Sequence, residues 1–384
     1  MISLAKPFFD EKEKEAVGRV LDSGWIMQGK RVADFETSIA EKCGSRHCIA
    51  VTSGTAALHI CLMALGIKQG DGIIIPSFAW PAAANIAHLL GAKPIFVDSK
   101  TSDYNLNVDL LEKIIEQSIS DGIRVKAIVP VHQFGAPCDI SKVLEFAAKY
   151  NLKVIEDSAC ALGTKINGQQ AGTFGVAGIF SFHPRKIITT AEGGAIITDS
   201  SDFAEKCRAL RNHGNLVSAG LNYRMTDIQA AIGLVQLGKL KTILSKRKYI
   251  IETYLEILDG QDGITLPEYL SNSVRSENAA SAVQTLMVLL DKDIDRDKII
   301  ARMAELKIET NTGSPAAHQL PIFAKTSDTC PAASELQKQG LALPLHAAMT
   351  KDDARKVAET LLDLIYPDTC EELQTAELET CLAE

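Results

Sequence analysis

Short runs of apolar residues recur along the first half of the chain and alternate with segments of helical spacing. An apolar run of about four to eight residues between turn signals is typical of a buried strand. Such runs predict seven strands, at 48–52, 72–76, 94–98, 126–131, 153–156, 178–182 and 195–198. Most of them are separated by helical patterns, so we predict an α/β fold with a mainly parallel seven-stranded sheet and helices on both faces.

The predicted helices of this part lie at 11–22, 30–43, 55–65, 81–90, 108–119, 140–150 and 202–210. The connection between the last two strands, 182–195, is short for a parallel crossover and has no helical pattern. We therefore predict that one edge strand runs antiparallel to the others.

The second half of the chain begins with a long amphipathic pattern over 227–255, which predicts a helix that bridges two domains. A strand at 280–290, a helix at 295–306, a short segment at 308–310 and a helix at 351–365 then indicate a smaller α/β unit. A chain of 384 residues also exceeds the size at which one core usually keeps growing. We expect a large domain at 1–240, a small C-terminal domain at 241–366 and an acidic, mobile tail at 367–384.

Composition narrows the class of partner. The formal charge of −8 and the pI near 5.6 count against nucleic acid and leave small-molecule substrates. Residues 1–10 lack the pattern of a signal peptide, and no apolar stretch is long enough to span a bilayer. Nine cysteines without a CxxC pair indicate a reducing compartment and no zinc site. We expect a cytoplasmic protein without a metal.

Lys186 lies in a polar loop between the last two predicted strands. A loop lysine is most often a solvated surface residue, because lysine is almost never buried without a partner. The alternative is an amine at the carboxyl end of a buried strand, where α/β proteins keep their chemistry. An amine there can form a Schiff base with an aldehyde cofactor.

Ser53, Gly54 and Thr55 join a predicted strand to a helix. Glycine lets a ligand approach the backbone closely, and the free amides of a helix start favour an anion such as phosphate. The simpler interpretation is an ordinary helix N-cap.

Other candidates follow further strands. Asp157 ends the strand at 153–156 and needs a cationic partner if it points inward, although a helix N-cap is equally compatible with it. Trp80 can stack on a flat ligand, or pack in the core. Ser181 and His183 flank the lysine loop as possible donors to phosphate or substrate, and the histidine is open to a structural role.

An amine, an acid for a ring nitrogen, an anion-binding helix start and an aromatic ring are together what pyridoxal 5′-phosphate requires. All four are predicted at the carboxyl ends of strands in one sheet. This combination favours that cofactor over any of the separate, simpler interpretations.

Several segments carry a closer resemblance. They are SGTAAL at 53–58, PIFVD at 94–98, ED at 156–157, SFHPRK at 181–186, EGG at 192–194, GLNYRM at 220–225, AAIG at 230–233 and LPLH at 343–346. With these segments the chain, from about residue 7 to 364, resembles the DegT/DnrJ family of pyridoxal-phosphate nucleotide-sugar aminotransferases, which have fold type I.

The resemblance implies roles for individual residues. Lys186 would form the internal aldimine, Asp157 would pair with the pyridine nitrogen, and Trp80 would lie against the ring. Gly54, Thr55 and Ser181 would bind the phosphate, and we expect Ser53 and His183 among the cofactor-binding residues as well. Asn222 would reach the phosphate of a neighbouring subunit, which implies a homodimer with shared active sites.

Two positions depart from the family pattern. Cys160 stands where the family usually has Gln or His in contact with the phenolic oxygen of the cofactor, and cysteine is a poorer donor. The segment 309–314 lacks the Arg-containing pattern of many members, so we carry no substrate contacts over to it.

The function implied is ping-pong transfer of an amino group, most simply from glutamate, to a nucleotide-linked keto-deoxysugar, with Lys186 moving the proton. Lysine at position 186 favours aminotransfer, because some dehydratases of the family carry histidine there. Alternatives are a ketocyclitol acceptor, a dehydratase, or a non-catalytic regulator, which the acidic charge disfavours.

Overall fold

A computed structural model describes residues 1–270, 282–324 and 330–367, and its larger part is built on one seven-stranded sheet. The strands are β1 (His47–Val51), β2 (Asp71–Pro76), β3 (Lys93–Val97), β4 (Arg124–Ile128), β5 (Lys153–Asp157), β8 (Ala177–Ser181) and β9 (Gly194–Thr198). Their order across the sheet is β1-β9-β8-β5-β4-β2-β3. All seven predicted strands are confirmed, and the apolar residues of the central strands are buried on both faces.

The antiparallel strand is not at the edge of the sheet. β9 lies between β1 and β8 and runs antiparallel to both, whereas β1 forms the edge. The sheet therefore contains an antiparallel strand, as predicted, but the prediction that this strand forms an edge was wrong. The short connection from β8 folds β9 back beside it as a hairpin, and β1 then pairs with the free side of β9.

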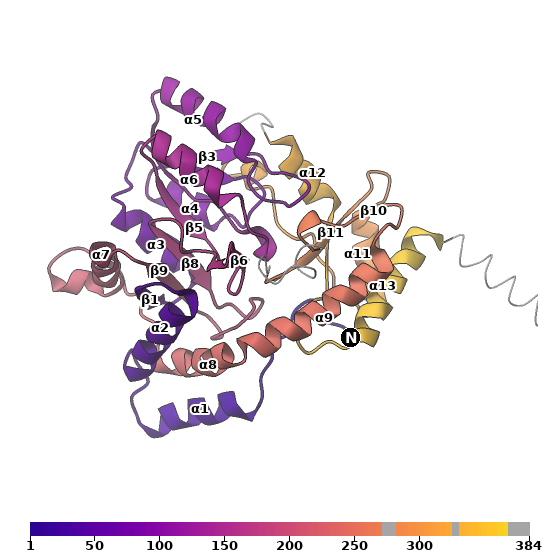
Figure 1. Cartoon of the computed structure of the whole chain (residues 1–384), viewed down its shortest axis with the longest axis horizontal. Helices are drawn as coiled ribbons and strands as arrows, with labels where there is room; N and C mark the ends of the chain where they lie inside the picture. Colours follow the sequence, from indigo (N-terminus) through magenta and orange to yellow (C-terminus); the bar gives the residue numbers. More distant parts are fainter. Residues whose placement is uncertain (271–281, 325–329, 368–384) are drawn as a thin grey trace, which may run out of the picture.

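Helices cover both faces of this sheet (Figure 1). They are α2 (Lys30–Cys43), α3 (Gly54–Ala64), α4 (Ala82–Leu89), α5 (Leu111–Ser120), α6 (Ile140–Lys149), α7 (Ser201–Arg211) and α8 (Asp227–Gly238). α1 (Glu11–Asp22) packs on α8 instead, on the side away from the sheet. On β2, Ile73 and Ile75 pack with α3, α4 and α7, whereas Ile74 between them packs with α5 and α6. This period of two explains why three successive residues of the strand, 73–75, are all apolar.

Short elements complete the larger part of the chain. They are η1 (Val108–Leu110), η2 (Gln133–Gly135), η3 (His213–Leu216) and the hairpin of β6 (Lys165–Ile166) and β7 (Gln169–Gln170). Among the described helices, none is both long and apolar enough to cross a bilayer.

The long helical pattern after residue 227 forms two helices rather than one. α8 ends at Gly238, and α9 (Leu240–Leu258) begins one residue later, after Lys239. The ammonium of Lys239 is held by Asp10 and Glu13 of the N-terminal segment, at 2.9 and 2.7 Å. Figure 1 shows α9 leading from the large sheet to a second group of elements. We propose that the larger domain ends here, at residue 240.

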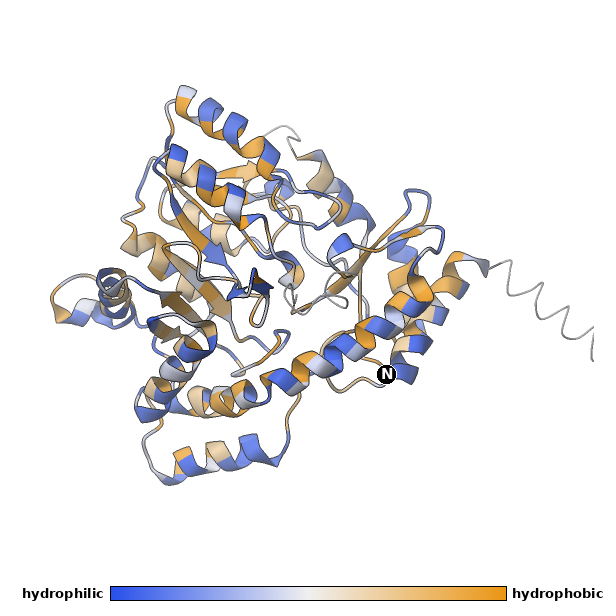
Figure 2. Ribbon diagram, viewed as in Figure 1, coloured by the Kyte–Doolittle hydropathy of each residue, from blue (hydrophilic) through white to orange (hydrophobic). Residues whose placement is uncertain are grey.

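The second group contains a three-stranded antiparallel sheet, β10-β11-β12. Its elements are β10 (Ile264–Thr265), β11 (Leu286–Leu290), α11 (Arg296–Glu305), η4 (Ala317–Gln319), α12 (Pro331–Gln339), β12 (Gly340–Leu343) and α13 (Lys351–Ile365). Figure 2 shows that α13 and α9 turn apolar residues toward each other and polar residues outward. The first residues of the strand predicted at 280–290 and the tail from 368 lie outside the described residues.

Aromatic rings join the two sheets. Phe78, Tyr104 and Phe134, from loops of the large sheet, pack edge to face with centroids 6.1 to 6.3 Å apart. They belong to the same buried core as β11 and β12. The Tyr104 hydroxyl donates to the carbonyl of Met287 on β11, at 3.1 Å. The loops beyond the large sheet are therefore fixed against the second unit.

Candidate active site

A cavity of about 440 Å³ lies at the carboxyl ends of the central strands, between the two sheets. Nine of the ten predicted site residues line it. They are Ser53, Gly54, Thr55, Trp80, Asp157, Cys160, Ser181, His183 and Lys186. The strand ends and helix starts that carry them are separated by more than a hundred residues of sequence, and the sheet brings them together.

Lys186 is held in the cavity by its neighbours rather than pointing freely into solvent. Its Nζ donates to Cys160 Sγ at 3.0 Å, and its backbone amide donates to the carbonyl of His183 at 2.8 Å. The amide side chain of Gln284 holds the preceding carbonyl, that of Arg185, at 2.7 Å. The interpretation of a plain surface lysine is therefore wrong.

Asp157 is buried at the end of β5, with 8% of its surface exposed. One hydrogen bond to its carboxylate comes from the amide of Ala159, at 3.0 Å. Burial raises the pKa of Asp157, although the Ala159 amide and the charge of Lys186 oppose the shift. No helix begins at this residue, so the N-cap interpretation is wrong. The carboxylate is short of donors and faces the cavity.

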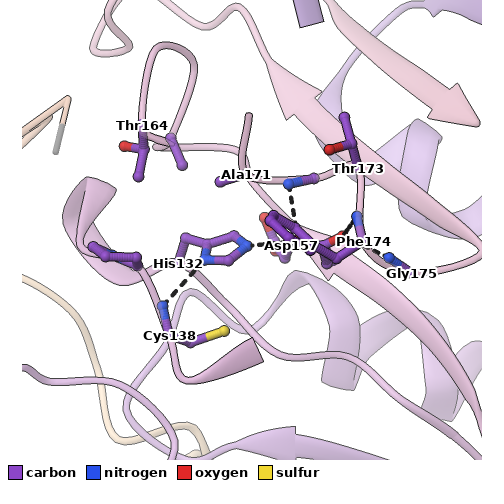
Figure 3. A network of polar contacts seen from close by, with 12 residues as sticks. His132, Cys138, Asp157, Thr164, Ala171, Thr173, Phe174 and Gly175 are labelled. Carbon is purple, nitrogen blue, oxygen red and sulfur yellow. Dashed lines mark hydrogen bonds and ion pairs between the residues drawn. The ribbon is translucent and has the colours of Figure 1, made fainter. Parts of the chain in front are cut away.

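The residue before it, Glu156, has the opposite environment. Figure 3 labels three of its partners, His132, Phe174 and Gly175. Its carboxylate accepts the backbone amides of Gly172, Phe174 and Gly175, at 2.6 to 2.8 Å, and the ring of His132 at 3.0 Å. His132 accepts the Cys138 amide on Nδ1, so its ring proton lies on Nε2, which donates to Glu156. This network fixes the loop before β8, and the sequence interpretation missed it.

The start of α3 forms the opposite wall. Ser53 caps the helix, its Oγ accepting the Ala56 amide at 3.1 Å, so the simple N-cap interpretation of this serine is confirmed. The first-turn amides of Gly54 and Thr55 have no acceptor within the helix. A Cβ on Gly54 would lie 2.9 Å from that of Ser181, so the helix start and the end of β8 meet only because residue 54 is glycine.

Trp80 and His183 lie toward the mouth of the cavity. The indole is 71% exposed, so Trp80 does not pack in the core. His183 accepts the Arg185 amide on Nδ1, at 3.2 Å, which gives the ring a structural role in the lysine loop. Partial burial lowers the pKa of His183, against the opposing effect of Glu192.

Asn222 does not line the cavity of its own chain. It is exposed and pairs with Asn212 in an isolated bridge. The sequence interpretation also missed residues of the second unit that close the cavity, because they lie in no recognisable motif. They are Gln284, Thr285, Gly313 and Ser314. Leu343 and Leu345 line it too, and their segment was one of the matching motifs.

The residues present fit pyridoxal phosphate. An amine, Lys186 Nζ, shares the cavity with the Asp157 carboxylate, whose pKa is raised by burial. The free amides at the start of α3 favour an anion, and Gly54 adds no side chain beside the end of β8. The fold and the cavity thus define a pyridoxal-phosphate-dependent enzyme of fold type I.

The comparisons with known proteins identify the family. Residues 7–362 match the model of the DegT/DnrJ/EryC1/StrS aminotransferase family. The chain belongs to this family, and it is a pyridoxal-phosphate-dependent aminotransferase. A GDP-perosamine synthase of Caulobacter vibrioides is 36% identical over 94% of this chain and 97% of its own.

Solved structures agree. The aminotransferase TlmJ of Streptoalloteichus hindustanus superposes with a TM-score of 0.88 at 29% identity, covering 96% of this chain and all of the other. Spr1654 of Streptococcus pneumoniae, in its PLP form, gives 0.86 at 25% identity over 94% and 97% of the two chains.

Proposed function

We propose that this enzyme transfers an amino group from an amino acid, most simply glutamate, to a nucleotide-linked keto-deoxysugar. The observation that supports it best is the grouping of the Lys186 amine, the buried Asp157 carboxylate and the α3 start around one cavity. The sugar acceptor is supported by the relative of 36% identity, whose name specifies a GDP-linked amino sugar.

Pyridoxal phosphate, when bound, supplies an aldehyde that bonds to amines and a ring that accepts electrons. In our proposal Lys186 Nζ would hold the cofactor covalently in the resting enzyme. Once released by the donor substrate, the same amine would move the proton, first as a base and then as an acid. The same steps in reverse on the acceptor give ping-pong kinetics.

Other residues of the chain would hold the cofactor. The carboxylate of Asp157 would pair with the positive ring nitrogen, and Trp80 would cover the ring face. Ser53, Gly54, Thr55 and Ser181 would bind the phosphate through amides and hydroxyls. Cys160, already in contact with Lys186, lies on the same side of the cavity as the lysine and would replace a stronger donor beside the ring.

We further propose a homodimer in which Asn222 completes the partner's site. The loop before Asn222 is strained, since His213, Asn215 and Leu216 have φ values of 52°, 50° and 61°. Leu216 and Val217 in this loop are 93% and 91% exposed. Strain and apolar exposure together suit a loop that rests on a second copy of the chain.

The central test is Lys186→Ala. We expect loss of the yellow chromophore, of its fixation by borohydride and of activity, because the amine that bonds the cofactor is gone. Lys165→Ala, an exposed lysine in the β6 hairpin, is the matched control and should keep all three. Full activity and chromophore in Lys186→Ala would overturn the assignment.

Substrates and assembly need separate tests. Purified enzyme with glutamate should aminate 3- or 4-ketosugar nucleotides rather than keto-inositols, and should release keto acid from glutamate without any acceptor. A regulator would release none. Mixing inactive Lys186→Ala with inactive Asn222→Ala should regain activity, because one site of each mixed dimer is then intact. We place the enzyme in the cytoplasm, in agreement with the seven cysteines of the described residues, which are all free thiols.

A further inference from the structure

A thiol and an amine meet in the active-site cavity. Cys160 Sγ accepts a hydrogen bond from Lys186 Nζ at 3.0 Å, and both side chains are half-buried and line the cavity. Cys160 follows β5 and Lys186 follows β8, which are adjacent parallel strands with Asp157 opposite Ile179. The sheet therefore fixes the contact between the two residues.

The other described cysteines have no comparable position. They are Cys43, Cys48, Cys61, Cys138, Cys207 and Cys330, and all of them are buried. Burial raises the pKa of the Cys43 thiol to about 12, and that of Cys48 well above its usual value. Such thiols react slowly, because the thiolate is the reactive form. Of the described cysteines, Cys160 alone combines access from the cavity with an amine neighbour.

We propose that Cys160 and Lys186 form an oxidation-sensitive pair in which a peroxide links the two side chains. Hydrogen peroxide oxidises the thiol to a sulfenic acid and is itself reduced to water. The lysine nitrogen then attacks the sulfur, the S–O bond breaks, and a second water leaves with a proton from the nitrogen. The product is a sulfenamide, Cys160 Sγ–Nζ Lys186, which a thiol reductant opens to the original pair.

The bridge has a direct consequence for the enzyme, which rests on the proposed role of Lys186. A lysine nitrogen bonded to sulfur cannot bond the cofactor aldehyde. Conversely, a lysine already bonded to the cofactor is protected. The pair is therefore exposed to peroxide in the cofactor-free protein, and in turnover after the donor has displaced the lysine.

The experiment is mass mapping of peroxide-treated enzyme. Cys370 and Cys381, which lie outside the described residues, are first changed to serine to remove their thiols. The holoenzyme is treated with hydrogen peroxide, with and without glutamate, and so is the cofactor-free protein. We expect a peptide pair joined between residues 160 and 186, lighter than the two peptides by two hydrogens. It should be scarce in the holoenzyme, increase with glutamate or without cofactor, and disappear with dithiothreitol.

Two variants make the test specific. Cys160→Ser keeps a small polar side chain beside Lys186 but cannot form the bridge, so it should give no joined peptide. In Lys186→Met the sulfenic acid has no amine to attack it, and dimedone labelling of Cys160 should rise. The proposal is wrong if wild-type Cys160 passes to sulfinic acid without a joined peptide, or if the link forms at another lysine. Cross-linking in the cofactor-free protein does not depend on aminotransferase activity, so this result is independent of the proposed function.

Discussion

Two neighbouring carboxylates on β5 have opposite environments. Glu156 and Asp157 are both buried, but they point to opposite faces of the sheet. Glu156 accepts four hydrogen bonds from three amides and a histidine, whereas the recorded bond to the Asp157 carboxylate comes from one amide. A buried carboxylate is costly unless its oxygens are paired. Glu156 is therefore paired within the fold, whereas Asp157 forms no ion pair with another described residue and remains available for a cationic group of a ligand.

This difference assigns separate tasks to the two residues. The network of Glu156 and His132 holds the 172–175 loop against β5 (Figure 3). That loop leads into β8, which ends beside the lysine loop. Asp157, one residue further, lies in the cavity itself. In our proposal Glu156 therefore serves the stability of the fold, and the adjacent Asp157 serves cofactor binding.

Asp157→Asn should show the largest effect on activity. The amide keeps the shape of the side chain but cannot neutralise a positive ring nitrogen. We expect kcat to fall about 10³-fold, the size typical for losing a charge-stabilising group at a reacting centre, while the cofactor-free protein stays folded.

The matched control is Asp139→Asn, which retains the cap of α6 at the Lys142 amide. Steady-state kinetics and circular dichroism of both variants are the measurements. A near-normal kcat in Asp157→Asn would mean that this carboxylate does not pair with the ring nitrogen of the cofactor. The proposed difference in role between Glu156 and Asp157 would then be wrong.

Glu156→Gln should act on stability instead. In the wild type both carboxylate oxygens accept hydrogen bonds from backbone amides. The NH₂ group of glutamine would replace one of these oxygens and would face a backbone donor, so both buried groups would be left unpaired. Removing one partner of a buried charged network costs about 3–5 kcal/mol, so denaturant unfolding should shift by that order. The surviving folded enzyme should keep a kcat close to that of the wild type.

The control for this variant is Glu112→Gln, which loses surface contacts to Lys149 and Tyr150 and should change stability little. A large loss of kcat with unchanged stability in Glu156→Gln would reverse the roles given to the two carboxylates.

The sequence could predict the strands but not this division of roles. The apolar runs place each strand within a few residues, because burial on both faces leaves a continuous signal. Strand order has no such signal, and so the antiparallel strand was expected at an edge of the sheet. α12 was missed because it mixes small and polar residues. Its first amides, at Ala332 and Ala333, are capped by Asp98 from a distant strand end.

At the site, strand ends and helix starts predicted nine cavity residues, because chemistry in such a sheet gathers at one edge. The sequence does not show how many hydrogen-bond donors each buried carboxylate meets. Nothing in the pair Glu156-Asp157 tells which carboxylate meets four donors. Gln284 has no motif at all, and its role follows only from the fold.

The raised pKa of Asp157 gives a smaller, pH-dependent effect on stability. Burial raises its pKa above the ordinary value of 3.8, so the folded cofactor-free protein binds this proton more tightly than the unfolded chain. The ionised carboxylate therefore destabilises the fold at neutral pH, and stability is regained as the pH falls through the raised pKa toward 3.8.

Asparagine mimics the protonated form, so cofactor-free Asp157→Asn should be more stable than the wild type at pH 7. The advantage should shrink as the pH is lowered. Urea unfolding of both proteins across this range measures it, and an advantage that grows toward low pH would contradict the assigned direction.

Gln284→Ala should have the smallest effect, and this effect should be on cofactor binding in the cavity that Asp157 lines. Its amide holds the Arg185 carbonyl at 2.7 Å, next to the lysine, and loss of one such hydrogen bond is worth about 0.5–1.5 kcal/mol. The lysine loop then loses one of its fixed points, so cofactor affinity should fall by up to roughly tenfold, with thermal stability almost unchanged. Gln319→Ala removes the same atoms from an exposed glutamine that contacts Ser334, far from the lysine loop in sequence, and should not alter cofactor titration by absorbance. Equal cofactor affinity in the two variants would contradict this role of Gln284. It would show that the large sheet fixes the lysine loop without help from the second unit.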